Sequence, residues 1–286
     1  MAIRMKEFKD KVVLVTGGSS GIGLATSKRL AGLGARVWLM ARTEDKLGAA
    51  LNDLRSIHDS SDHRFGVLPV DVTDEKRVER AISRMITEVG LPDLVITSAG
   101  AAHPGYVNEL GLDIYRWMMD VNYFGSVYVI KALLPRMIER GSGYIVTISS
   151  QAGFLGVFGY TAYGASKFAV RGFSDALRAE VKPYGIGVSV VFPPDTDTPE
   201  LAYESQYKPM ETKELAGTSG LVSADVVAEA IVKGVARGQY TILPGMEGKI
   251  LYRLNGLIGN GVYPIMDMLI AQAQAKKKKM ATGSAK

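Results

Sequence analysis

Short runs of apolar and β-branched residues alternate along the chain with longer stretches in which apolar residues recur every three or four positions. The runs are four to six residues long, which is typical of buried strands. The longer stretches, such as EKRVERAISRMITEVG and SKFAVRGFSDALRAEV, have the period of amphipathic helices. Seven strands are predicted, at residues 12–16, 36–41, 65–70, 93–98, 144–149, 187–192 and 240–243.

This alternation predicts a parallel sheet, because parallel neighbours need a crossover of about a dozen residues or more. We therefore expect an α/β fold of the doubly wound, Rossmann type, with about seven strands and helices on both faces. Ligands of such folds bind beyond the carboxyl ends of the strands. Residues 1–245 are predicted to form this domain and to hold the catalytic site, with residues 246–286 as an apolar extension ending in a basic tail.

The net charge of +5 is confined to the end of the chain. Five lysines and no acidic residue lie within residues 276–286, so the first 275 residues have a net charge of zero. No stripe of basic and aromatic residues indicates nucleic-acid binding. The chain has no cysteine and only His58, His63 and His103 as histidines, so no metal site is expected. The first ten residues lack the apolar core of a signal peptide, which predicts a cytoplasmic protein.

The sequence TGGSSGIG, at residues 16–23, follows the first predicted strand and precedes a helix. Gly17 permits a tight turn, Gly21 lets the backbone approach a pyrophosphate, and Gly23 allows close packing of the helix. Free N–H groups at the helix start favour phosphate binding. The alternative is a plain turn whose glycines accept positive φ. The cofactor contacts predicted here are Gly17, Ser19, Ser20, Gly21, Ile22 and Gly23.

The second predicted strand ends in Met40-Ala41-Arg42. An acidic residue is expected there if a ribose 2′-hydroxyl is bound, whereas an arginine suits a 2′-phosphate. Arg42 therefore favours NADPH/NADP+ over NADH/NAD+, unless it is only a solvated residue at a helix start. Asp71 and Val72, after the third strand, are predicted to flank the adenine.

Tyr163 and Lys167, in YGASK, lie four positions apart in a helical stretch, so they share one face. A nearby ammonium group favours the phenolate, which predicts a lowered pKa for Tyr163 and a better proton donor for a developing alkoxide. Such a pair alone is usually an ordinary helix face. Of the thirteen tyrosines, however, only Tyr163 has a lysine four positions later.

Several motifs together resemble the short-chain dehydrogenases/reductases over about residues 8–245: TGGSSGIG, DV at 71–72, a degenerate SAG at 98–100, VN at 121–122, SS at 149–150 and YGASK. The resemblance implies an NADP-dependent enzyme acting on a CH-OH/C=O pair, assembled as a homodimer or homotetramer. It implies that Tyr163 is the general acid/base and that Lys167 binds the nicotinamide ribose and lowers the tyrosine pKa. It further implies that Ser150 holds the substrate oxygen and that Asn122 supports a proton-relay water.

Two segments depart from the family pattern. Thr97-Ser98 replaces the usual asparagine pair before Ala99 and Gly100, which are themselves expected to contact the cofactor. After the sixth predicted strand, Pro193 is followed by a second proline where the family has glycine. Thr196 or Thr198 remains available for the nicotinamide amide, and residues 194–217 are predicted to form a mobile lid, with an exposed connector as the alternative.

A closer resemblance is to the 3-ketodihydrosphingosine (3-ketosphinganine) reductase branch, and it rests on SSQAGFLGVFGYTAYGASKFAVRG, EVKPYG and PPDTDTPE. It implies NADPH-dependent reduction of a long-chain β-keto amine. A reductase of another carbonyl (a β-ketoacyl thioester, a steroid or a xenobiotic) and an NADP-binding scaffold without activity stay open. Apolar residues between Ser150 and Tyr163 can line an alkyl groove or pack against the lid: Phe154, Leu155, Val157, Phe158 and Tyr160.

Residues 250–275 are largely apolar but are interrupted by Arg253, Pro264 and Asp267. The segment is too broken for a spanning helix of about 20 apolar residues. Peripheral contact with a membrane surface through this segment and its lysines is one interpretation. Packing against another subunit or the lid is the other, and both stay open.

Overall fold

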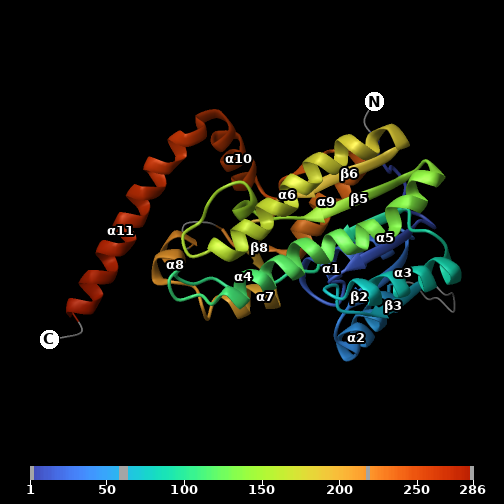
Figure 1. Ribbon diagram of the computed structural model, residues 1–286, viewed down its shortest axis with the longest axis horizontal. Helices are drawn as coiled ribbons and strands as arrows, with labels where there is room; N and C mark the ends of the chain where they lie inside the picture. Colours follow the sequence, from blue (N-terminus) through green and yellow to red (C-terminus); the bar gives the residue numbers. More distant parts are fainter. Residues whose placement is uncertain (1–2, 58–63, 217–219, 284–286) are drawn as a thin grey trace.

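The computed structural model describes residues 3–57, 64–216 and 220–283. Seven parallel strands form one sheet in the order β3-β2-β1-β4-β5-β6-β9 (Figure 1). The predicted α/β fold with seven strands is therefore confirmed. The strands are β1 (Val12–Thr16), β2 (Arg36–Ala41), β3 (Phe65–Pro69), β4 (Leu94–Thr97), β5 (Gly143–Ile148), β6 (Ile186–Val191) and β9 (Thr241–Ile242).

Alternate residues of each strand enter two separate cores, because side chains of a strand point to opposite faces. In β1, Val13 and Val15 pack under one helical layer, while Val12 and Leu14 pack under the other. The first layer contains α1 (Gly21–Gly32), α2 (Glu44–Arg55) and α9 (Ala224–Arg237). The second contains α3 (Glu75–Val89), α5 (Gly125–Arg140) and α6 (Thr161–Val181).

Smaller elements cover the carboxyl edge of the sheet. A two-stranded sheet of β7 (Thr196–Asp197) and β8 (Val222–Ser223), which the sequence pattern did not predict, lies between β6 and α9 in the chain. These strands are two residues long, too short to show a period of two. The remaining elements here are α4 (Leu112–Met118), the π-helix η1 (Met119–Phe124), η2 (Gln151–Gly153), α7 (Pro199–Glu204) and α8 (Met210–Ala216).

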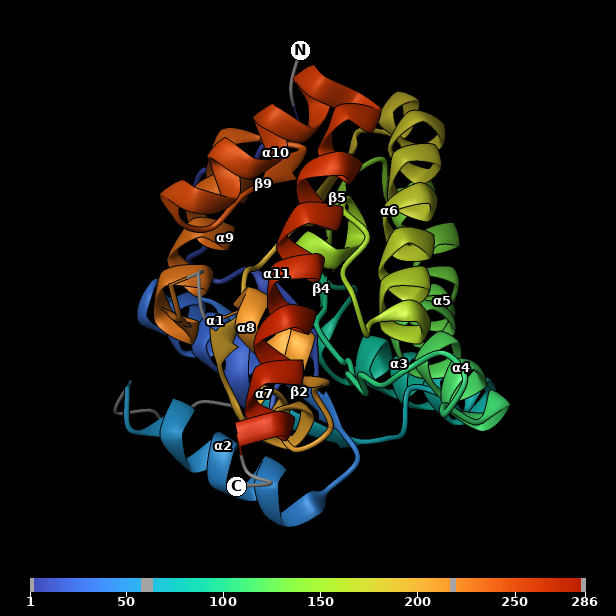
Figure 2. The same cartoon turned by 90° about the vertical axis from the view of Figure 1, so that its left-hand side faces the viewer.

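The C-terminal segment forms α10 (Met246–Ile258) and the long helix α11 (Val262–Gly283), which runs along the side of the molecule past α8 (Figures 1 and 2). Lys276 forms an ion pair with Glu214 of α8 at 2.7 Å, and Lys277 forms one with Glu211 at 3.3 Å. Within the described residues, no helix is both long and apolar enough to cross a membrane. Lys286 and the side chains of Lys278 and Lys279 lie outside the described part.

The turn between β1 and α1 depends on glycines. Gly17 has φ +64° and Gly21 has φ +51°, a backbone region that side chains disfavour. A Cβ on Gly17 would lie 2.8 Å from the Cα of Ala99, at the end of β4. A Cβ on Gly23 would overlap the backbone carbonyl of Gly17. The first turn of α1 therefore sits directly against the end of β1.

Gly23→Ala is expected to lower the free energy of unfolding by about 1–3 kcal/mol, since the new methyl group meets backbone that cannot move aside cheaply. Gly32→Ala is the control on the same helix, where the nearest atom would be 3.9 Å away. It should leave stability unchanged or raise it by up to about 1 kcal/mol. Urea unfolding of both variants measures this, and equal midpoints would contradict the packing argument.

Candidate active site

Four predicted catalytic residues meet at the carboxyl edge of the sheet. Helix α6 carries Tyr163 and Lys167 on one face, one turn apart. Ser150 follows the end of β5, and Asn122 lies in the π-helix between α4 and α5. The fold thus brings together side chains from three elements that are distant in the chain.

Lys167 is buried, with 5% of its surface exposed. Its Nζ donates a hydrogen bond to the carbonyl oxygen of Ile148, at the end of β5, at 3.1 Å. The same ammonium group lies 5.5 Å from the centroid of the Tyr163 ring. A buried charge is costly unless it has partners, so these contacts fix the position of the ammonium.

The two adjacent serines have different partners. Ser149 is buried and donates to the backbone oxygen of Lys167 at 2.9 Å, so it joins β5 to α6. Ser150 accepts from the N–H of Ala152 at 3.2 Å and interacts with the hydroxyl of Tyr163. Of the two serines, Ser150 is therefore the one that faces the Tyr163 hydroxyl.

Asn122 is 1% exposed, and all three of its side-chain hydrogen bonds are 2.9 Å long. Its Oδ1 accepts from the N–H of Ala101, and its Nδ2 donates to the carbonyl of Ala101 and to Ser166. Ser166 in turn donates to the backbone carbonyl of Tyr163 at 2.7 Å. Asn122 therefore joins the loop after β4 to the catalytic helix α6.

The prediction that Lys167 lowers the pKa of Tyr163 is wrong for this structure. Burial raises the pKa of the phenol well above its ordinary value, and the Glu200 carboxylate raises it further. The Ser150 hydrogen bond acts in the opposite direction without offsetting the rise. Burial also lowers the pKa of Lys167, which Glu200 opposes.

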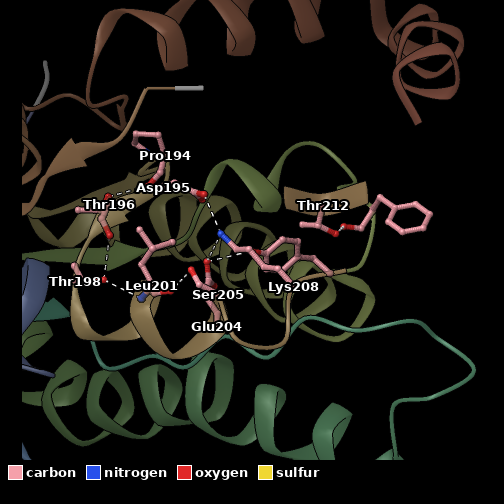
Figure 3. Close-up of polar contacts among 11 residues, drawn as sticks. Pro194, Asp195, Thr196, Thr198, Leu201, Glu204, Ser205, Lys208 and Thr212 are labelled. Atoms are coloured by element: carbon pink, nitrogen blue, oxygen red, sulfur yellow. Dashed lines mark hydrogen bonds and ion pairs between the residues drawn. The ribbon is translucent and has the colours of Figure 1, made fainter. Parts of the chain in front are cut away.

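A network of charged residues in the predicted lid contributes to the raised pKa of Tyr163 (Figure 3). Lys208 forms ion pairs with Glu204 at 2.8 Å and with Asp195 at 3.0 Å. Tyr160 donates a hydrogen bond to Glu204 at 3.1 Å, and its ring lies 5.5 Å from that of Tyr163. The lid is thus joined by charge and hydrogen bonds to the residues beside the catalytic tyrosine.

The glycine turn forms a cradle that suits a dinucleotide. The N–H of Gly17 donates to the carbonyl of Met40 at 2.8 Å, so the turn lies beside the end of β2. A Cβ on Gly21 would lie 3.0 Å from Thr198 of the lid. Ser20 begins α1 without a side-chain capping bond. The N-terminus of α1 follows this turn, and helix N-termini suit a phosphate.

The predicted adenosine contacts lie at the ends of neighbouring strands. Arg42 is exposed, and its guanidinium lies 3.9 Å from the Asp71 carboxylate. Asp71 also accepts two hydrogen bonds from Thr73. The Val72 side chain is buried against α5, whereas Ile22 is half-buried against the core below α1.

The two threonines predicted to reach the nicotinamide amide, Thr196 and Thr198, bond within their own loop. Thr196 donates to the carbonyl of Pro194 at 2.8 Å, while Thr198 donates to the carbonyl of Thr196 and caps α7 (Figure 3). Pro193 is buried, and its carbonyl accepts from Gln151 beside Ser150. The loop therefore lies between the glycine turn and the catalytic serine.

The strand end after β4 shows the effect of the departure from the family pattern. Thr16 accepts from the N–H of Ala99 at 3.0 Å, and Ala99 and Gly100 lie beside Gly17 and Lys167. Within the described residues, the Thr97 hydroxyl is the one buried side-chain polar atom without a hydrogen-bond partner.

Other predicted features form the wall around the site. His103 bonds to the hydroxyl of Tyr203 at 3.0 Å and lies 4.3 Å from the ring of Tyr207, while His58 and His63 lie outside the described residues. Phe154 packs against Phe192 and Tyr252 of α10, outside the predicted lid, whereas Tyr160 bonds to Glu204 of the lid. Residue 217, the last of the predicted lid, also lies outside the described part.

The sequence reasoning missed the charged residues of the lid. They are spaced four residues apart, at Glu200, Glu204 and Lys208. That pattern alone indicates an exposed helix with ion pairs. Only the fold shows that α7 brings Glu200 and Glu204 close enough to affect Tyr163.

A family model described as short chain dehydrogenase matches residues 11–208. A 3-dehydrosphinganine reductase of Danio rerio is 42% identical over 243 residues, which cover 85% of this chain and 73% of the relative. A fatty acyl-CoA reductase of Acinetobacter baylyi is 34% identical over 234 residues, covering 81% and 76% of the two chains.

A solved structure of a short chain dehydrogenase/reductase from Burkholderia phymatum in complex with NAD has a TM-score of 0.78 and 23% identity, covering 89% of this chain and 95% of that one. It shows the same fold. The predicted resemblance to 3-ketosphinganine reductases is confirmed by the curated relatives. The chain belongs to the short-chain dehydrogenase/reductase family, whose members are NAD(P)-dependent oxidoreductases that interconvert a carbonyl and a hydroxyl group.

Proposed function

We propose that the protein reduces the keto group of 3-ketosphinganine to the 3-hydroxyl of the sphingoid base, with NADPH as the cofactor. The observation that carries this proposal is the position of Tyr163, whose hydroxyl interacts with Ser150 while Lys167 lies below its ring. Similarity to proteins named 3-dehydrosphinganine reductase supports the choice of substrate.

Each catalytic side chain has a role in this reaction. NADPH, when bound, supplies the hydride. Ser150 and Tyr163 hold the ketone oxygen, and Tyr163 donates the proton that neutralises the developing alkoxide. The raised pKa keeps that proton on the phenol at neutral pH. Lys167 orients the cofactor ribose, and Asn122 holds the groups through which the phenol regains its proton.

The nucleotide end of the site favours NADPH. Arg42 is exposed beside the glycine turn, so its guanidinium can reach a 2′-phosphate with charge-assisted hydrogen bonds. The carboxylate of Asp71 lies beside the same arginine. Without Arg42 to neutralise the 2′-phosphate, this carboxylate would repel it. Discrimination between NADPH and NADH therefore depends on Arg42.

A reductase of another carbonyl is the second candidate. The same site chemistry serves any ketone or thioester, and the relative named fatty acyl-CoA reductase shares this family. An NADP-binding scaffold is disfavoured, because Ser150, Tyr163 and Lys167 are all present and in contact. Consumption of NADPH with 3-ketosphinganine in mixed micelles, compared with a β-ketoacyl thioester, separates the three.

Tyr163→Phe removes the proton donor and should lower kcat on 3-ketosphinganine by at least about 10²- to 10⁴-fold. NADPH binding, followed by its fluorescence, should persist. Tyr184→Phe, at an exposed tyrosine, is the control and should retain full activity. Near-normal turnover by the Tyr163 variant would contradict the assigned role.

Arg42→Ala should raise KM for NADPH by about 10- to 100-fold, because a charged hydrogen bond contributes about 1.5–3 kcal/mol. The KM for NADH should change little, so the preference between the cofactors falls. Arg55→Ala, at the far end of α2, is the matched control. A parallel loss with both cofactors would show that Arg42 does not read the phosphate.

We also propose that residues 246–286 form an extension to the catalytic domain of residues 1–245 and hold the enzyme on a membrane surface. Four exposed apolar residues of α10 lie at helical spacing on one face: Met246, Ile250, Leu254 and Leu257. Lys249 and Arg253 follow the same spacing beside them. This arrangement is typical of an interfacial helix. Self-association through the same face is the alternative, and a homodimer or homotetramer is expected for the family.

The double variant Ile250→Asp, Leu257→Asp should reduce partitioning onto vesicles with anionic lipid by at least about tenfold, since both side chains would otherwise be buried in the lipid interface. Val226→Asp, at an exposed apolar residue of α9, is the control. Light scattering in detergent-free buffer distinguishes the alternative. Unchanged flotation, together with dissociation of an oligomer, would assign this face to a subunit interface.

A further inference from the structure

Glu200 lies in the first turn of α7, two residues after Thr198, and reaches the catalytic centre from the lid. A Cβ placed on Gly100 would lie 3.4 Å from Nζ of Lys167 and 3.9 Å from Oε2 of Glu200. The same point lies 3.2 Å from Oδ1 of Asn122. The Glu200 carboxylate therefore shares one small space with two of the four catalytic side chains.

The two other lid carboxylates that affect Tyr163, Asp195 and Glu204, already have a cationic partner. Lys208 lies between Asp195 and Glu204 (Figure 3). Tyr160 donates a further hydrogen bond to Glu204. By contrast, among residues 3–57, 64–216 and 220–283 the Glu200 side chain forms no ion pair within 4.0 Å and no hydrogen bond. It keeps both oxygens available to a ligand, although it is partly buried beside a catalytic lysine.

The substrate of the proposed function carries an ammonium group on the carbon next to its ketone. Any group that recognises this ammonium must lie close to Ser150 and Tyr163, which hold the ketone oxygen. Glu200 meets this requirement, since its Oε2 lies in the same space as Nζ of Lys167, which is 5.5 Å from the centroid of the Tyr163 ring. A carboxylate is also the natural partner of an ammonium group in a partly dry site.

We propose that Glu200 determines substrate specificity by binding the ammonium group adjacent to the ketone, so that the enzyme selects aminoketones over neutral ketones. This inference rests on the proposed function and deepens it.

Binding of the ammonium also affects the proton donor. Burial and then Glu200 raise the pKa of Tyr163, which makes the phenol a weaker acid. A cation bound at Glu200 offsets that carboxylate and lowers the pKa of Tyr163 again. An aminoketone thus strengthens the acid that protonates its developing alkoxide, and a neutral ketone in the same place does not.

The test compares wild type with Glu200→Gln on two substrates, 3-ketosphinganine and a long-chain ketone of equal length in which hydrogen replaces the amino group. For wild type, kcat/KM should be higher for the aminoketone. In Glu200→Gln it should fall by about 10- to 100-fold on the aminoketone and by less than about threefold on the neutral ketone. Glu75→Gln is the control, since Glu75 also lies in the first turn of a helix but is exposed and far from the site in the chain.

The outcomes separate this inference from the proposed function. If wild type does not reduce 3-ketosphinganine, the proposed function fails and this inference with it. If wild type reduces it but Glu200→Gln loses equal activity on both ketones, the inference alone is overturned. The Kd of NADPH, measured by fluorescence on each variant, then shows whether the equal loss arises at the cofactor. A selective loss on the aminoketone supports the inference, and unchanged selectivity overturns it.

Discussion

The burial of one charged group, the ammonium of Lys167, constrains the centre of this protein. Removing such a charge from water costs several kcal/mol unless partners replace the water. The carbonyl of Ile148 does so at the exact point where β5 ends, and the Tyr163 ring covers another side. Strand β5, helix α6 and the catalytic tyrosine are consequently fixed relative to one another by the same group. Ser149, which binds the backbone oxygen of Lys167, tightens this joint.

A second buried lysine imposes the same constraint on the lid. Lys208 needs both Asp195 and Glu204, so the start of the lid and the segment after α7 must stay together. Their carboxylates, with that of Glu200, add to the rise in the pKa of Tyr163 that burial causes. The position of α7 and the acidity of the Tyr163 phenol are therefore coupled through electrostatics.

The seven strands could be predicted because each is a short apolar run whose alternate residues enter two cores, as Val12 to Val15 do in β1. Tyr163 and Lys167 could be located because helical spacing places them on one face. The direction of the shift in the Tyr163 pKa could not be predicted, since burial of the phenol, and then Glu200 from a separate helix, cause the rise. The strands β7 and β8 were also missed, because two residues carry no periodicity and their pairing depends on where the lid lies. The local sequence pattern thus predicts the strands and helices, whereas the pKa of Tyr163 depends on contacts between residues distant in the chain.

The C-terminal extension is attached by two kinds of contact that differ in strength. The inner face of α10 packs Tyr252 against Phe154 and Phe192, behind the turn that carries Ser150. Burial of an aromatic side chain of this kind contributes about 1.5–3 kcal/mol to stability and is insensitive to salt. The exposed Lys276–Glu214 pair is of the kind that contributes about 0–1 kcal/mol and weakens as ionic strength rises. Lys277, by contrast, pairs with Glu211, whose side chain is 4% exposed, and donates to the hydroxyl of Tyr106. Aromatic contacts therefore hold α10 beside the active site, whereas polar contacts, one of them to a buried carboxylate, join α11 to the lid.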